Sequence, residues 1–303
     1  MKNHFGVLLV LMSAVFWGTA GLFVGTLRDS YGISPLQIIL GRSIMTIALL
    51  GLFMLLYNKN LFRVKLKDLW LFAATGIGSI TFFNYCYYNT MALINLSVAA
   101  VLMYTAPIFV MIISLIFFNE KLTVTKVTCC LLAVIGVSLV SGIVGNSGNF
   151  NTKGLILGLL TGFGYSLYGI LSSILIKRGY SPYTINFYSF VFVGLSVSLL
   201  IFKQLPQTYS LYTVNYKPIA VIFLMALINT VIPYIAYSSG LKTVRPTVAI
   251  IIATIEPVVA MIIDIIKGHT PDVFGYIGIA IILFAVVLLN LKESKTNDSK
   301  SEC

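Results

Sequence analysis

The side chain with the clearest chemical potential is Glu256, an acid inside a long apolar stretch. It lies about ten residues from both Arg245 and Lys267. At about 1.5 Å of helix rise per residue, this spacing puts the carboxyl group near the middle of a lipid bilayer. A carboxylate at that depth is costly unless it is paired, protonated or in contact with water, and Pro257 removes a backbone donor beside it. Two interpretations stay open: Glu256 couples proton movement or binds an ammonium group, or it is a protonated, hydrogen-bonded structural acid.

Arg42 is a second charged side chain inside an apolar stretch, seven residues from its start. It can extend to the interface, or it can pair with a carboxylate of the protein or of a solute, and the sequence favours neither. Asp264 is three residues from Lys267, which favours an interfacial position. Glu120 is expected to be a gate or a packing residue at a helix end.

Polar and aromatic side chains cluster within residues 82–89. On a helix, Tyr85 and Tyr88 share one stripe, and Asn84 lies one turn before Tyr88. A stripe of this kind could stack on a zwitterionic or aromatic solute and hydrogen-bond to it. Aromatic packing plus an interfacial belt is the alternative. Further candidates of the same kind are Trp17, Tyr104, Tyr165, Tyr168, Asn229, Tyr234 and Tyr237.

Composition places these residues in a membrane. The 303 residues are 58% hydrophobic and only 10% charged, whereas an ordinary soluble domain has about 25% charged residues. The apolar residues form runs of about twenty, which is the length of a transmembrane helix. The net charge of +11 is distributed between these runs, so it indicates membrane topology and not a nucleic-acid surface.

We expect ten transmembrane helices, because only a helix satisfies its own backbone polar groups in lipid. The first run is too long for the apolar core of a signal peptide and has no convincing cleavage site, so it counts as a span. The predicted spans are residues 5–27, 35–57, 68–91, 97–118, 123–144, 154–176, 182–203, 218–239, 247–266 and 272–291.

Basic residues predict the orientation, since Lys and Arg favour cytoplasmic loops. With the N-terminus inside, most basic residues fall on the inner side. Only the following would fall outside: Arg28, Lys153, Lys203, Lys217 and Lys267. We therefore expect a multi-pass protein of the cytoplasmic membrane with both termini in the cytoplasm.

The two halves of the chain share a pattern. Ser-Pro pairs open the second and seventh predicted helices at Pro35 and Pro182, and Pro107 and Pro257 recur in the fourth and ninth. Five spans per half is an odd number, so the second half enters the membrane from the opposite side, as in transporters with inverted repeats. The predicted units are a first repeat at 1–145, a second repeat at 152–291 and a polar cytoplasmic tail at 292–303.

In the order of these motifs, the chain resembles the drug/metabolite transporter superfamily, specifically its ten-helix EamA-type branch. The segments that carry the resemblance are Trp17-Gly18, Arg42, the stretch from Ala92 to Pro107, Asn119 to Leu122, Glu256-Pro257 and the glycine-punctuated helices at 123–144 and 272–291. The chain departs from the family at Lys267-Gly268-His269, where a Gly-Glu pair is common. Any role that the family gives to this acidic residue therefore cannot be assigned to the second half of this chain.

The resemblance implies a secondary transporter, commonly an exporter of amino acids or related small metabolites. The alternatives are an importer or exchanger of another polar or lipid-linked solute, or, least favoured, a membrane enzyme or sensor. No nucleotide-binding loop, metal-ligand cluster or nucleophile triad is present in the sequence. We therefore expect no cofactor, no metal and no enzymatic activity. The expected partners are a small solute, membrane lipid and protons, but not nucleic acid, with a monomer or a homodimer as the assembly.

Two smaller expectations concern packing. Glycines at four-residue spacing, Gly154, Gly158 and Gly162, should let the sixth helix approach a neighbour closely. The cysteines lack the spacing of a metal or redox site and should act as small apolar residues. They are Cys86, Cys129, Cys130 and Cys303.

Overall fold

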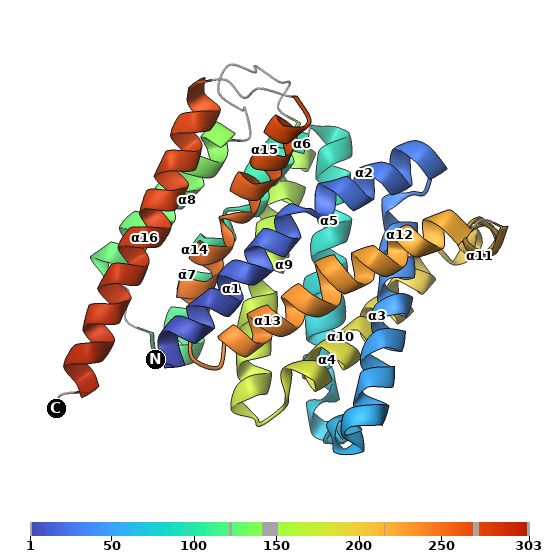
Figure 1. The fold of residues 1–303 in the computed structure, drawn as a ribbon, viewed down its shortest axis with the longest axis horizontal. Coiled ribbons are helices and arrows are strands. Elements are labelled where there is room, and N and C mark those ends of the chain that lie inside the picture. Colours follow the sequence, from blue (N-terminus) through green and yellow to red (C-terminus); the bar gives the residue numbers. More distant parts are fainter. Residues whose placement is uncertain are drawn as a thin grey trace.

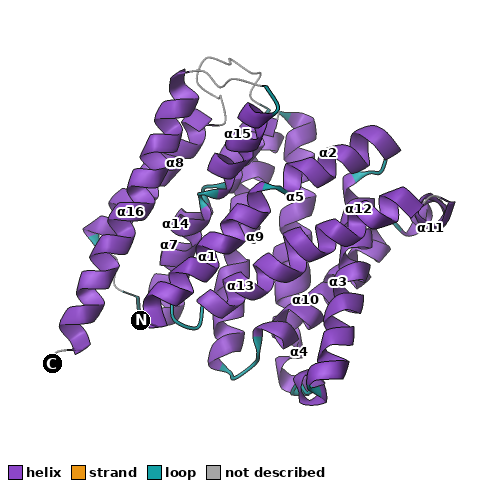
Figure 2. Cartoon of the chain, in the orientation of Figure 1, coloured by secondary structure: helices purple, strands orange, loops and turns teal. Residues whose placement is uncertain are grey.

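The protein is a helical bundle, seen here in a computed structural model that describes residues 2–94, 96–120, 123–140, 151–214, 216–268 and 273–301. All secondary structure in these described residues is helical, without a strand (Figure 2). Eight helical segments are long and apolar enough to cross a membrane, and two shorter apolar helices, Val124–Val140 and Val273–Leu289, complete the predicted ten. The all-α membrane fold is therefore confirmed.

The first half supplies five spans. They are α1 (Lys2–Gly18) with α2 (Ala20–Tyr31); α3 (Pro35–Tyr57); α4 (Leu69–Ala73), η3 (Ala74–Thr81) and α5 (Phe82–Leu93); α6 (Leu96–Met103) with α7 (Ala106–Phe118); and α8 (Val124–Val140). Two short 3₁₀ helices, η1 (Lys59–Phe62) and η2 (Leu66–Asp68), connect the second and third spans.

The second half has the same plan. Its spans are α9 (Thr152–Lys177); α10 (Pro182–Leu200); α12 (Tyr216–Ala226), η5 (Leu227–Val231) and α13 (Ile232–Gly240); α14 (Pro246–Ala253) with α15 (Glu256–Ile266); and α16 (Val273–Ser301). An additional helix that the sequence analysis did not predict, α11 (Leu205–Val214), follows η4 (Phe202–Gln204).

The Ser-Pro pairs begin their helices as predicted. Ser34 forms a capping box with Gln37, and the Ser181 hydroxyl accepts a hydrogen bond from the Thr184 backbone N–H at 3.2 Å. Each proline fits at the first helical position, where the missing N–H would have no partner in the helix. The second and seventh spans therefore start at the same motif.

Three of the predicted spans, 5–27, 97–118 and 247–266, are present but are each interrupted by a short turn. A threonine marks each interruption: Thr19, Thr105 and Thr254. Each threonine hydroxyl donates to the carbonyl three residues earlier, at 2.7, 2.6 and 2.6 Å. This hydroxyl bond competes with the regular helical ladder, and in the fourth and ninth spans the nearby proline adds to the break.

The third and eighth spans share another irregularity. Each contains a π-helical segment, η3 in the third span and η5 in the eighth, between two α-helical pieces. Such segments are rare and often occur at functional sites. Their matching positions add to the similarity of the two halves.

Helix pairing shows how the halves combine (Figure 1). The first span packs on the eighth through α1 and α13, and the third packs on the sixth through α5 and α9. The second span packs on the seventh, the fourth on the ninth and the fifth on the tenth. If each span of the first half is exchanged with the corresponding span of the second half, the same five pairs result. The beginning of α1 and the end of α16 lie at the same end of the bundle, as two inverted five-span repeats require.

The predicted close approach of the sixth helix is confirmed. A Cβ atom at Gly158 would lie 2.2 Å from Leu102 Cδ1, and one at Gly162 would lie 2.4 Å from Thr105 Oγ1. The glycine stripe therefore holds α9 against the interrupted fourth span. Cys86, Cys129 and Cys130 are free and buried, while Cys303 and His269 lie outside the described residues.

Candidate functional site

Glu256 is the first residue of α15, directly after the break in the ninth span. The Tyr165 hydroxyl, from α9, lies 3.5 Å from Glu256 Oε2. Tyr104, which lies in the break of the fourth span, also interacts with this carboxyl group. The position of Glu256 at a helix N-terminus also favours negative charge. The two broken spans therefore meet around one acid, between the repeats.

An aromatic cluster, defined as Trp17, Tyr168, Tyr234 and Tyr237, lies beside this acid. The Trp17 ring is 5.3 Å from the rings of both Tyr234 and Tyr237, measured between centroids. Tyr168 is 4.9 Å from Tyr234 in an edge-to-face arrangement. These separations are typical of favourable aromatic pairs. The cluster joins α1 of the first repeat to α9 and α13 of the second.

Arg42 approaches the cluster from α3. Its Nε atom is buried and has no hydrogen-bond partner among the described residues. The guanidinium group interacts electrostatically with Tyr88 and Tyr234, and Tyr234 also interacts with Glu256. Tyr234 thus lies within electrostatic range of a fixed positive group and of an acid. Buried polar atoms are rarely left without a partner. Among the described residues, the Nε–H group of Arg42 therefore lacks the hydrogen-bond acceptor that a buried donor normally has.

A polar network that the sequence analysis missed supports the cluster. The Tyr168 hydroxyl donates to Asn186 Oδ1 at 2.8 Å and shares a hydrogen bond with the Ser238 hydroxyl at the same distance. The Asn186 side-chain amide in turn donates to the Tyr234 backbone carbonyl at 3.2 Å. The network fixes the backbone that carries Tyr234. The sequence feature that could have indicated this network is Asn186, an asparagine within an apolar run.

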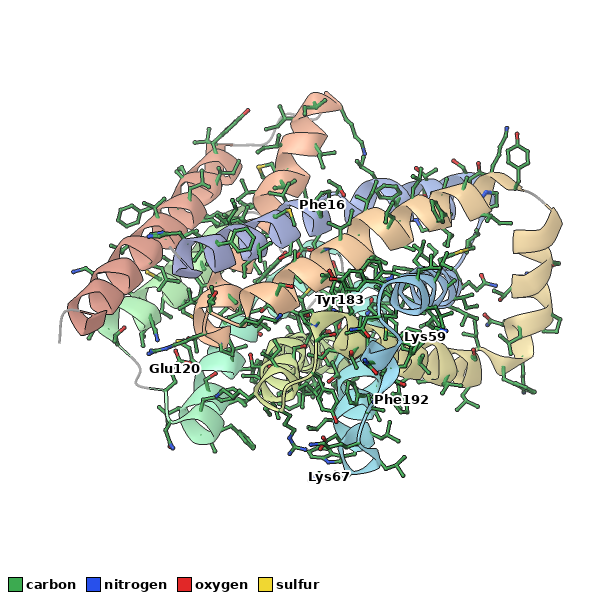
Figure 3. The ribbon with its side chains drawn as sticks, turned by 60° about the horizontal axis from the view of Figure 1, so that its bottom comes forward. Phe16, Lys59, Lys67, Glu120, Tyr183 and Phe192 are labelled. Carbon is green, nitrogen blue, oxygen red and sulfur yellow. The ribbon has the colours of Figure 1, made fainter. Side chains whose placement is uncertain are left out.

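Three predicted site residues lie elsewhere. The Asn229 amide donates to the backbone carbonyl of Phe16 and to Thr19 Oγ1 at 2.9 Å, so it caps the break of the first span. Figure 3 labels Phe16, which marks the position of this break. Asn84 is buried and donates to the Ile80 carbonyl of its own helix at 2.7 Å. Tyr85 is 43% exposed and faces outward.

Tyr87 is a residue that the sequence analysis passed over. It lies within electrostatic range of Glu256, and its ring is 6.0 Å from that of Tyr88. Phe83, one turn earlier, packs against Tyr165 at 5.3 Å. The inner face of α5 is therefore defined by Phe83, Tyr87 and Tyr88, not by the stripe through Tyr85.

Glu120 is buried at the end of the bundle that carries both termini. Its Oε1 atom accepts hydrogen bonds from Lys126 Nζ at 2.6 Å and from the Thr247 hydroxyl at 2.5 Å, and Arg245 is 3.9 Å away. Figure 3 shows Glu120 between the end of α7 and the start of α14. The acid thus links the fourth and ninth spans, in keeping with the expected packing role. Lys121 lies outside the described residues.

Metal binding finds no support in the described part of the chain, which contains no group of three or more His, Cys, Asp or Glu residues placed to hold an ion. The central site instead consists of one acid, one arginine and several aromatic rings. It can bind small charged or amphipathic molecules through ion pairs, hydrogen bonds and ring contacts.

Comparison with known proteins gives a consistent result. A sequence profile of the EamA-like transporter family matches residues 4–142 and 152–291. The uncharacterized transporters YxxF and YdfC of Bacillus subtilis strain 168 are 24% and 26% identical, covering 96% and 93% of this chain and 91% and 89% of their own length. An uncharacterized transporter of Archaeoglobus fulgidus is 25% identical and covers 94% of this chain and 96% of its own.

A solved crystal structure has a similar fold. The TM-score is 0.76, and the match covers 96% of this chain and 98% of the other. At 16% sequence identity, this similarity concerns the arrangement of helices alone.

Proposed function

The chain belongs to the EamA-like transporter family, and from that premise we propose that it exports a small amphipathic solute, such as an amino acid, by secondary active transport. The observation that carries the proposal is that Tyr234 lies within electrostatic range of both Arg42 and Glu256. Both lie where the two inverted repeats meet, and solute sites of repeat-built transporters lie at such interrupted helices.

The charges fit a zwitterion. Arg42 has a buried Nε atom without a partner in the described residues, and a guanidinium group binds carboxylates with two parallel hydrogen bonds. Glu256 can receive an ammonium group, to which aromatic faces also contribute. The aromatic cluster then contacts the apolar part of the solute. A solute with only one of the two charges would leave the other protein group unpaired, which is costly away from water.

Glu256 also offers a means of coupling. An acid near the bilayer midplane is stabilised by a proton or by a cationic solute group, but not by both at once. A proton arriving on Glu256 can therefore displace the ammonium group. In this proposal a proton enters the cell as the solute leaves, while the two repeats rock around the site.

The proposed orientation has both termini in the cytoplasm. The basic residues Lys65, Lys67, Arg178, Lys242 and Arg245 lie in connections that the sequence analysis assigns to the inner side. These connections are at the end of the bundle where α1 begins and α16 ends (Figure 1). The excess of positive charge at that end supports a cytoplasmic location.

The test is a flux assay in proteoliposomes loaded with radiolabelled amino acids or with the corresponding amines, which lack the carboxylate. Wild type should transport the amino acids but not the amines, and Arg42→Gln should lose transport of the amino acids and gain transport of the amines. Arg28→Gln is the matched control, because the Arg28 side chain is 57% exposed and, among the described residues, its one ion pair is with its neighbour Asp29. If Arg42→Gln treats both solute classes as wild type does, the zwitterion assignment is wrong. If wild type moves none of them, the proposed solute class is wrong, and inward flux would reverse the proposed direction.

A further inference from the structure

A cavity lies away from the central site, at the end of the bundle that carries both termini. It has a volume of about 650 Å³, within the range of small-molecule sites. The ends of α7, α9 and α13 and the start of α14 surround it, together with α8 and α16. We call it the basic pocket, because its lining includes Lys126, Lys177, Lys242, Arg245 and Lys292.

The charge of the basic pocket is unbalanced. Among the described residues, Glu120 is the one acid in the lining, and that carboxylate already binds Lys126 and Thr247. The ammonium group of Lys177 instead lies 4.0 Å from the centre of the Phe118 ring, and neither Lys177 nor Lys242 pairs with a carboxylate in the described residues. Topology alone places basic residues at this face, but it does not require them to converge on one cavity.

The pocket also contains an unsatisfied hydroxyl group. Ser173 lines the cavity and is only 4% exposed, yet its Oγ atom has no hydrogen-bond partner among the described residues. A buried hydroxyl normally finds one. An anionic oxygen in the cavity would accept this hydrogen bond while the neighbouring ammonium groups balance its charge.

We propose that the basic pocket binds a phosphate monoester, as a soluble organic phosphate or as the headgroup of phosphatidic acid. A phosphate monoester carries nearly two negative charges at neutral pH and several acceptor oxygens, which suits Lys177, Lys242 and Ser173 together. Ile176, Leu241 and Leu289 in the same lining would contact the organic part. Basic pockets between transmembrane helices bind anionic headgroups in this way. The site is independent of solute binding at Glu256.

The test measures thermal stabilisation of the purified full-length protein. One arm adds inorganic phosphate, with sodium chloride of equal ionic strength as reference. The other compares phosphatidylcholine nanodiscs with and without phosphatidic acid. Stabilisation by mass action is expected in at least one arm: phosphate alone indicates a soluble ligand, and phosphatidic acid alone indicates a lipid headgroup. No stabilisation of the wild type in either arm overturns the proposal.

Substitutions in the basic pocket test whether the thermal stabilisation arises from binding at that site. Lys177→Gln with Lys242→Gln should weaken the apparent affinity about thirtyfold, given the usual contribution of each basic residue to anionic-lipid binding. Ser173→Ala should weaken it by a smaller factor without altering the charge. The matched control is Lys59→Gln with Arg63→Gln, two exposed residues outside the pocket. Equal weakening by the two double variants would mean a general surface-charge effect and would exclude the pocket.

Discussion

Tyr104 and Glu256 belong to different repeats, yet both lie where a span is broken, and the tyrosine side chain interacts with the carboxyl group. The site is thus built where the interrupted fourth and ninth spans meet. It is also asymmetric, since the residue before Pro107 is Ala106, whereas Glu256 precedes Pro257. The inverted repeat supplies two equivalent breaks, and only one of them carries an acid.

Removing the hydroxyl that faces this acid should impair transport. Tyr165→Phe deletes the donor 3.5 Å from Glu256 Oε2 while keeping the ring. Hydrogen bonds to charged groups are worth about 1.5–3 kcal/mol, so we expect uptake efficiency in proteoliposomes to fall by about tenfold or more. Tyr276→Phe is the control, because Tyr276 is exposed on α16. Equal effects of the two substitutions would remove the Tyr165 hydroxyl from the site.

The aromatic cluster should determine affinity for the solute. Tyr234 contacts Trp17, Tyr168 and Phe190 by ring edges or faces. A contact of the Tyr234 ring with the solute should contribute about 0.5–1.5 kcal/mol beyond burial, so Tyr234→Ala should raise KM by up to about tenfold, whereas the exposed Tyr276→Ala should leave it unchanged. The measurement is concentration-dependent uptake. An unchanged KM for Tyr234→Ala would mean that the solute does not contact the cluster.

The glycine stripe of α9 should tolerate no side chain. In an open helix, Gly→Ala stabilises by about 0.8–1 kcal/mol, and Gly21→Ala should do so because nothing lies within 4 Å of its added Cβ. At Gly162 the same change meets Thr105 Oγ1 at 2.4 Å and the Leu102 carbonyl at 2.8 Å. Gly162→Ala should therefore destabilise the protein by about 1–3 kcal/mol, measured by denaturant unfolding in detergent. Stabilisation by Gly162→Ala would contradict the observed approach of the helices.

The buried pair Glu120–Lys126 should matter more than an exposed pair. Its side chains are 4% and 1% exposed, against 64% and 57% for Asp29 and Arg28. Breaking a buried pair leaves one charge uncompensated, so Glu120→Gln should cost about 3–5 kcal/mol, while Asp29→Asn should cost about 1 kcal/mol or less. The variant Glu120→Gln with Lys126→Met should recover part of the loss in the same unfolding assay. Purely additive losses would show that the two groups do not stabilise each other.

Much of the fold could be read from the sequence, because lipid permits few alternatives. The apolar runs and the Ser-Pro pairs before Pro35 and Pro182 predicted the spans and where two of them begin. The interruptions at Thr19, Thr105 and Thr254 were not predicted, since a threonine that bonds back to a carbonyl looks in sequence like any threonine in a helix. Pro107 and Pro257 were the only local signals of two of these breaks.

The site could be predicted only in part. Glu256 and Arg42 stood out because charged residues are rare in apolar runs. Which aromatic side chains face them depends on the rotation of each helix, and one residue changes that direction by about 100°. This is why Tyr87 was missed and Tyr85 was selected. The hydrogen bonds through Asn186 and Ser238 join spans that are far apart in the chain. A single sequence contains no pattern that predicts such contacts.

The central claim is that Glu256 couples solute movement to protons between the two repeats. The most direct measurement compares counterflow exchange with accumulation driven by an imposed pH gradient, in proteoliposomes of wild type, Glu256→Gln and the exposed-acid control Asp29→Asn. We predict that Glu256→Gln does not accumulate solute under the pH gradient and exchanges it only at solute concentrations well above the wild-type KM, because the variant lacks both the proton site and the ammonium partner. The control should exchange and accumulate solute as wild type does. Accumulation by Glu256→Gln equal to that of wild type would contradict the claim.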